Sequence, residues 1–260
     1  MTETPLDRAH AAMEAAPGDE AARLGFYERL ADGELFLLLA AEPDGGAVEP
    51  EIFETAEGHF VLVFDRVERL AAFTGRSAPY AALSGRAVTD MLAGQGLGLG
   101  VNLGVASSAI LIPPEAVGWL AETLGARPRE LAEKPETLAP PAGLPERLVA
   151  GLDVKLAASA GLARMAYLAS VTYRGGRRAH LLALIDPVPG ANEALARAVG
   201  EALIFSGLDA GELDVAFFRA ADPVSARLAK VGLRFDLPEA RTAEAPRAPG
   251  TDPARPPKLK

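Results

Sequence analysis

The sequence contains no cysteine, only three histidines and a single tryptophan. Without cysteine the chain can form no disulfide bond, no thiolate metal site and no thiol nucleophile, which fits a reducing compartment such as the cytoplasm. With so few histidines, no H-E-x-x-H motif and no paired-carboxylate signature, the sequence offers little support for an enzyme. We therefore predict a cytoplasmic protein that is not an enzyme, with no catalytic residues and no metal site.

Long hydrophobic runs and an excess of positive charge are also missing. The best apolar run, ELFLLLAAE at residues 34–42, is far shorter than the roughly 18 residues of a membrane span. The first residues lack the apolar core of a secretory signal. The net charge is -9 and the last 23 residues are net positive, so the rest of the chain is more acidic still. A protein with this excess of negative charge repels the phosphate backbones of nucleic acids. We expect a soluble protein that binds neither membranes nor nucleic acids.

The chain is long enough, at 260 residues, for two domains with well-filled cores. Two stretches rich in proline and charge interrupt the apolar patterning, as linkers and disordered tails do. We predict an N-terminal arm (1–18), a first module (19–125), a linker (126–143), a second module (144–237) and a disordered tail (238–260).

The first module mixes helix and strand signals. Helices are predicted after Asp19, Asp65 and Ser84, because these residue types cap helix N-termini, and Asp65 has a glutamate three residues later as in a capping box. Two apolar runs, ELFLLLA (34–40) and HFVLVFD (59–65), predict buried strands. A last helix is expected after two consecutive prolines, closed by a glycine.

The second module carries the clearest strand signals. Two apolar runs, ARMAYLASVTY (163–173) and RRAHLLALID (177–186), flank a Gly-Gly pair, which supplies the positive φ that a two-residue hairpin loop needs. A helix before the hairpin (144–160), a helix after it (192–207) and two further strands complete the pattern. We predict an α+β protein: mixed sheets packed by helices, in two compact modules joined by a proline-rich linker.

The segment from Gly94 to Gly104 holds five glycines. Their spacing does not match the G-x-G-x-x-G dinucleotide fingerprint in any frame, and the segment lacks the lysine of a phosphate-binding P-loop. We therefore expect no bound cofactor. Large apolar residues alternate with small ones, which predicts a strand with one bare face that a backbone, helix or ligand can approach closely. We favour close packing, and retain Gly98, Gly100 and Asn102 as candidates for an interaction surface.

Arg174, Arg177 and Arg178 form a local basic patch in an acidic protein. With a two-residue loop, the hairpin pairs Arg174 with Arg177 and Tyr173 with Arg178, so that like charges face each other at the tip. Such a pairing costs stability unless an anion or acidic partner relieves it. We favour solvated arginines, since exposed charges need no partner, and retain the three as candidate interaction residues.

His59 and His180 each stand six residues before an aspartate, Asp65 and Asp186, at the end of an apolar run. Six residues of strand span roughly 20 Å, which is too far for one metal ion or one acid–base pair. We interpret each pair as a polar strand start followed by a helix-capping aspartate. The repetition is also a hint that the two modules are duplicates.

Two parts of the sequence resemble the domains of a known family. The runs FYERLADGELFLLLA (26–40) and VLVFDRVERLAAFTG to AVGWLAE (61–122) resemble the N-terminal domain of the SseB family, named for enhanced serine sensitivity. The run MAYLASVTY to LRFDLPE (165–239) resembles that family's C-terminal domain. The family often has Asn-Pro-Gly where this chain has Leu103 in the middle. The resemblance implies a cytoplasmic bacterial protein of two α+β modules with a link to amino-acid tolerance, and it supplies no catalytic residues.

These observations predict a non-catalytic regulatory protein that acts by binding another protein, whose identity the sequence does not indicate. The alternative is a sensor in which one module binds a small molecule, an amino acid or related metabolite, in a concave pocket with a few convergent polar groups.

Overall fold

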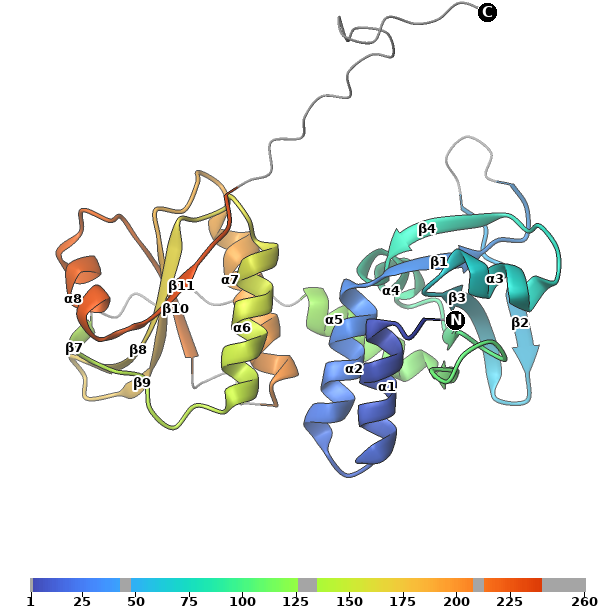
Figure 1. Ribbon diagram of the computed structural model, residues 1–260, viewed down its shortest axis with the longest axis horizontal. Coiled ribbons are helices and arrows are strands. Elements are labelled where there is room, and N and C mark those ends of the chain that lie inside the picture. Colours follow the sequence, from blue (N-terminus) through green and yellow to red (C-terminus); the bar gives the residue numbers. More distant parts are fainter. Residues whose placement is uncertain (1, 43–47, 126–134, 208–212, 240–260) are drawn as a thin grey trace, which may run out of the picture.

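The computed structural model describes residues 2–42, 48–125, 135–207 and 213–239. These residues form two modules side by side, each a mixed sheet packed by helices (Figure 1), which confirms the α+β prediction. The predicted tail from residue 240 onward lies outside the described residues, as does the first part of the predicted linker.

The first module is built on a sheet with the strand order β4-β1-β3-β5-β6, and β2 pairs with β3. The central strand β3 runs parallel to β5 and antiparallel to β1 and β2. Its strands are β1 (Glu34–Leu38), β2 (Ile52–Thr55), β3 (Gly58–Phe64), β4 (Tyr80–Ser84), β5 (Gly98–Val101) and β6 (Ile110–Ile112). Its helices are α1 (Pro5–Ala15), α2 (Glu20–Asp32), α3 (Val67–Thr74), α4 (Gly85–Leu92) and α5 (Pro114–Gly125).

The alternation of side chains along β1 and β3 divides the core of this module between two faces. Leu35 and Val61 belong to the larger cluster, which α1, α2, α4 and α5 cover. Leu38 and Phe64 point to the opposite face, where the only helix packed against them among the described residues is the short α3, through Leu70. The second face is therefore covered thinly.

The residues predicted as an N-terminal arm form α1, so that prediction is wrong. Thr4 accepts a hydrogen bond from the backbone of Asp7, and the Asp7 carboxylate accepts one from the backbone of Thr4. This capping box, with Pro5 in the first turn, starts a helix that packs against α2. Because Leu6 is buried in the core of the first module, α1 is part of the domain.

The helix caps are only partly as predicted. Asp19 and Ser84 accept hydrogen bonds from backbone N–H groups at the starts of α2 and α4, which confirms both caps. Asp65 does not cap α3: the cap position is Arg66, with no side-chain hydrogen bond. The carboxylate of Asp65 instead accepts hydrogen bonds from Arg69 and Thr4, because a guanidinium is a stronger partner than a backbone amide.

The second module contains a sheet with the order β10-β9-β8-β11, and β7 pairs with β8. Helices α6 and α7 pack on one face and α8 on the other. Its strands are β7 (Pro135–Ala139), β8 (Met165–Tyr173), β9 (Arg178–Ile185), β10 (Leu213–Phe218) and β11 (Leu233–Asp236). Its helices are α6 (Glu146–Ala158), α7 (Asn192–Phe205) and α8 (Pro223–Val231). Since β7 falls within the predicted linker, the linker is shorter than 126–143.

The two sheets share a geometric pattern but not a chain order. In each, a pair of antiparallel strands (β1 with β3, β8 with β9) is flanked by one antiparallel and one parallel neighbour. The aspartates of the two His–Asp pairs follow equivalent strands: Asp65 comes directly after β3, and Asp186 directly after β9. However, in the first module the antiparallel neighbour (β4) comes before the parallel neighbour (β5) in the chain. In the second module the antiparallel neighbour (β11) comes after the parallel one (β10). A simple duplication does not produce this difference.

The glycine-rich segment forms β5, a strand shorter than the predicted alternation. Its bare face is filled from within the first module. A methyl group at Gly98 would lie against the ring of Phe60 and 2.8 Å from the carbonyl oxygen of Ile112, and one at Gly100 would lie 2.5 Å from Leu62. Both glycines are buried, so β5 presents no exposed glycine face to another molecule.

Replacing Gly98 by alanine is expected to destabilise the protein by about 1–3 kcal/mol, because the added methyl group overpacks a filled interior. Gly118→Ala is the matched control, since a methyl group there meets nothing within 4 Å; helix propensity predicts a gain of about 0.5–1 kcal/mol. Urea unfolding measures both changes. A Gly98→Ala protein as stable as the parent would contradict the packing described.

Candidate functional site

A buried polar network, here called the Asp7 network, closes one end of the first sheet. The Arg69 guanidinium donates hydrogen bonds to both carboxylate oxygens of Asp7, at 3.0 and 2.5 Å, and to Asp65 at 2.7 Å. Asp65 also accepts a hydrogen bond of 2.5 Å from the Thr4 hydroxyl. The network thus connects α1 to α3 and to the end of β3.

Asn102, a predicted interaction residue, belongs to this network. Its side chain accepts a hydrogen bond from the backbone of Asp65 (3.1 Å) and donates one to Ser108 (2.9 Å), which donates to Asp7 (2.6 Å). Asn102 is fully buried and has a φ of 49°, a left-handed conformation that asparagine tolerates better than most residues. Its position assigns it to the turn between β5 and β6 and gives it no exposed surface.

The Asp7 carboxylate is held in its ionised form. Burial opposes ionisation, but hydrogen bonds from Arg69, Ser108 and the Thr4 backbone outweigh it and hold the pKa of Asp7 well below its usual range. The same contacts, chiefly the hydrogen bond to Asp7, raise the pKa of Arg69. The pair is a fixed ion pair inside the first module.

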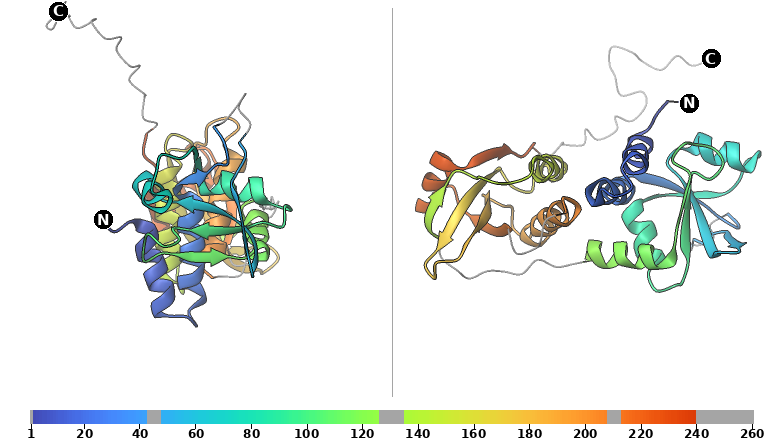
Figure 2. Two further views of the ribbon diagram at one scale, coloured as in Figure 1. Left: turned by 90° about the vertical axis from the view of Figure 1, so that its right-hand side faces the viewer. Right: turned by 90° about the horizontal axis from the view of Figure 1, so that it is seen from below.

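A second group of charges joins the two modules, and we call it the interdomain cluster. It consists of Glu28 and Asp32 on α2, Arg86 on α4, Lys155 on α6 and Glu201 on α7. Arg86 donates to both oxygens of Glu201 at 2.6 Å and to Asp32 at 2.5 Å. Lys155 donates to Asp32 at 2.6 Å and to Glu201 at 3.3 Å. Figure 2 shows α6 and α7 facing the first module across this contact.

The environment of the interdomain cluster shifts the pKa values of Glu28 and Asp32 in opposite directions. Burial raises the pKa of Glu28, and the nearby charge of Asp32 adds to that effect. Burial also tends to raise the pKa of Asp32, but hydrogen bonds from Lys155 and Arg86 outweigh this effect and lower the pKa. Beside the charges, Phe205 from α7 packs into the apolar core of the first module. The modules therefore share both polar and apolar contacts.

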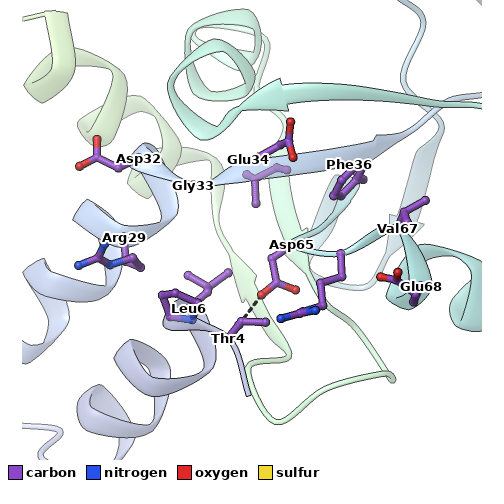
Figure 3. A pocket seen from close by; sticks show the side chains of 13 residues that line it. Thr4, Leu6, Arg29, Asp32, Gly33, Glu34, Phe36, Asp65, Val67 and Glu68 are labelled. Carbon is purple, nitrogen blue, oxygen red and sulfur yellow. Dashed lines mark hydrogen bonds between the residues drawn. The ribbon is translucent and has the colours of Figure 1, made fainter. Parts of the chain in front are cut away.

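A cavity of about 560 Å³ opens on the first module between the start of α1, the end of α2, β1 and the start of α3 (Figure 3). The hydrogen bond from Thr4 to Asp65 lies in its wall. Its lining includes side chains of both charge signs: Arg29, Arg66, Glu34 and Glu68 are among them. Such a mixture suits a ligand that carries a positive and a negative group.

The hairpin that carries the three candidate arginines has a different register from the one predicted. Thr172 pairs with Arg178, and the backbone N–H of Tyr173 donates to the carbonyl of Arg177. The loop therefore has three residues, ending in Gly176 with a φ of 85°, because a glycine in that position completes the common three-residue turn. The facing pair Arg174 and Arg177 does not exist.

The three arginines consequently have different surroundings. Arg177 stacks on the ring of Tyr173 at 4.3 Å and pairs with the buried Asp214 at 2.8 Å. The Tyr173 hydroxyl donates to the same carboxylate, and burial together with this bond raises the pKa of Tyr173. Arg177 thus contributes to the module's own structure, while Arg174 and Arg178 are exposed.

A set of aromatic side chains, here called the aromatic patch, lies on the thinly covered face of the first sheet. The patch consists of Phe36, Phe53, Phe64, Phe73 and Tyr80. Ring contacts of 5.3 to 6.2 Å join Phe36 to Tyr80 and Phe73 to Phe53 and Phe64, and Phe36 pairs with Phe64 across the strands. Phe73 is 37% and Tyr80 43% exposed. No local pattern in the sequence indicates this patch, because its members come from four strands and α3.

The described residues contain neither a cluster of metal-ligating side chains nor a helix that could span a membrane. No three histidine, aspartate or glutamate side chains there are grouped so that they could hold a metal ion. None of the described helices is both long and apolar enough to cross a membrane.

Residues 6–119 match the family model of the SseB protein N-terminal domain. The matched segment begins in α1 and ends in α5, so it coincides with the first module. The expected C-terminal domain of that family is not shown by a match. No curated protein and no solved structure matches the chain.

Stability should depend on pH through Asp7. The pKa of Asp7 is lower in the folded protein than in the unfolded chain, so the unfolded chain binds its proton at higher pH. The stabilisation is therefore complete above about pH 5 and is lost progressively as the pH falls through and below 4. Asp7→Asn should remove this component and cost about 3–5 kcal/mol, because Arg69 is left buried without its main partner. Urea unfolding from pH 7 to pH 3 tests this, with the exposed Asp153→Asn as the control; parallel pH curves for parent and Asp7→Asn would contradict it.

Glu201→Ala should loosen the contact between the modules, because it removes the acceptor of two Arg86 hydrogen bonds and one from Lys155. Small-angle X-ray scattering should show a larger radius of gyration, while circular dichroism stays the same. Glu193→Ala, on the exposed side of the same helix, is the control. An unchanged scattering profile for Glu201→Ala would show that apolar contacts alone hold the modules together.

Proposed function

We propose that this chain, whose residues 6–119 match the SseB N-terminal domain, is a non-catalytic regulatory protein of the cytoplasm that acts by binding another protein. The observation that carries the proposal is the aromatic patch. The link to serine tolerance is part of the proposal and rests on the family resemblance. Neither a cofactor nor a metal ion has a role in it.

The aromatic patch has the composition of a binding surface. Aromatic side chains are enriched at the energetically important centres of protein interfaces, because they bury a large area at a small entropic cost. Here Phe73 and Tyr80 expose more than a third of their surface while contacts with neighbouring rings hold them in place. The surface is thus preorganised for a partner with a complementary apolar face.

Two carboxylates with lowered pKa values support a role without catalysis. A general acid or base works best when its pKa lies near the working pH. Asp7 and Asp32 are instead held ionised by arginine and lysine side chains, and their pKa values are lowered. These carboxylates connect elements and modules, which is a structural task.

A small-molecule sensor is the second candidate function, and the cavity of Figure 3 favours it. Its volume of about 560 Å³ lies in the range of small-ligand sites. Arg29 and Arg66 can meet a carboxylate, and Glu34 and Glu68 an ammonium group, so a free amino acid fits the lining chemically.

The double change Phe73→Ser and Tyr80→Ser should abolish capture of the partner from a lysate of the native host, because it removes the exposed centre of the aromatic patch. The matched control is Val154→Ser with Leu233→Ser, two apolar side chains of the second module that are 48% and 42% exposed. Quantitative mass spectrometry compares the captured proteins. If the same proteins are captured by the aromatic variant and the parent, the patch is not the binding surface.

Thermal-shift measurements with the twenty amino acids test the second candidate. A ligand present at 100 times its dissociation constant stabilises the folded protein by about 2.7 kcal/mol, which raises the melting temperature measurably. Arg66→Gln should reduce that shift. The absence of a shift with every amino acid would remove the amino-acid sensor from consideration.

A further inference from the structure

One face of the second sheet changes character halfway along its strands. In β8 and β9 the cross-strand pairs Ala166 with Leu184 and Leu168 with Leu182 are apolar, and α6 and α7 cover them. The next pairs on the same face, Ser170 with His180 and Thr172 with Arg178, are polar. These four side chains are half-buried or exposed. The helices therefore cover the apolar half of the face and leave the polar half open.

The open half forms a pocket. Strand β7 extends it, because Thr137 pairs with Thr172 and Ala139 with Ser170. The volume is about 410 Å³, and the polar side chains that line it are Thr137, Ser170, Thr172, Arg178 and His180. One wall is the segment before α6: the carbonyl of Ala142 lies 3.0 Å from Nε2 of His180. Since a carbonyl oxygen can only accept, His180 donates through Nε2.

The lining has the chemistry of an anion site. None of the residues that line this pocket is acidic, although the chain as a whole carries a net charge of -9. Arg178 supplies a permanent positive charge, and the hydroxyl groups of Thr137, Ser170 and Thr172 supply neutral donors. Within the described residues Arg178 has no ion-pair partner, so its charge is available to a ligand.

We propose that this pocket binds a small molecule through an oxyanion group, a carboxylate or a phosphate. An arginine beside several hydroxyl donors is the arrangement that recognises such groups, because charge-assisted hydrogen bonds are stronger than neutral ones. The pocket is on the second module, away from the aromatic patch and the cavity of Figure 3. The proposal is therefore independent of the proposed function, and either can fail without the other.

Isothermal titration of the full chain with inorganic phosphate and with succinate, at matched ionic strength, tests the proposal and distinguishes the two groups. We expect one of these probes to bind with a stoichiometry of one. Arg178→Gln should weaken that binding about tenfold or more, the loss typical of removing a charged hydrogen-bond partner. Thr172→Val, which keeps the shape of the side chain and removes the hydroxyl, should weaken it by a smaller factor of about threefold.

Arg174→Gln is the matched control, because it makes the same change in net charge at an exposed arginine of the same hairpin that does not line the pocket. It should leave the affinity within about twofold of the parent. The proposal is overturned if neither probe binds, or if Arg178→Gln and Arg174→Gln weaken binding equally, since a general charge effect then explains it. Unfolding midpoints equal to that of the parent would show that the variants are folded.

Discussion

The relative placement of the two modules depends on Glu201. This buried side chain of the second module accepts two hydrogen bonds from Arg86 of the first module and one from Lys155 beside it. Removing charges from water costs several kcal/mol for each ion, so the pairing mainly offsets that cost and adds little net stability. Its contribution is orientation. A bidentate contact between a guanidinium and a carboxylate is satisfied at one relative position of the two groups.

The interdomain cluster contains more acidic than basic side chains, and its acids have different surroundings. Three carboxylates share two basic side chains, so one negative charge is in excess when all are ionised. Burial raises the pKa of Glu28, which contacts Lys155 at 3.4 Å, whereas hydrogen bonds from Lys155 and Arg86 lower the pKa of Asp32. Phe205 adds apolar contact beside the charges. The modules are thus oriented by ion pairs and sealed by a hydrophobic side chain.

The aromatic patch and the pocket of the second module both lie where helices do not cover a sheet. In the first module the short α3 leaves Phe73 and Tyr80 partly exposed. In the second, α6 and α7 end over the apolar half of their face and leave Thr172 and Arg178 open. The side chains differ in kind, aromatic in one case and polar in the other, so we assign them different partners. The same architectural feature, an incompletely covered sheet, provides both regions.

Local signals in the sequence indicated most of the helices, the longest strands and several of their ends. Asp19 and Ser84 cap helices because a capping bond spans only two or three residues. The capping box of Thr4 and Asp7 is equally local, but the helix that it starts, α1, was not predicted. The two glycines indicate the hairpin correctly. They do not fix its register, because Gly175 and Gly176 fit a loop of two residues as well as one of three.

Tertiary structure decided what those residues meet. The sequence indicated that Gly98 needs space, but only the fold shows that Phe60 fills it. It singled out Asn102 and Arg178 as candidates, and the structure buries the first in the Asp7 network and places the second beside Ser170 and Thr137. The family match covers only the first module, so the sites of the second rest on geometry alone. The physical reason is range: periodicity and capping act within a few residues, whereas ion pairs and pockets join residues that are distant in the chain.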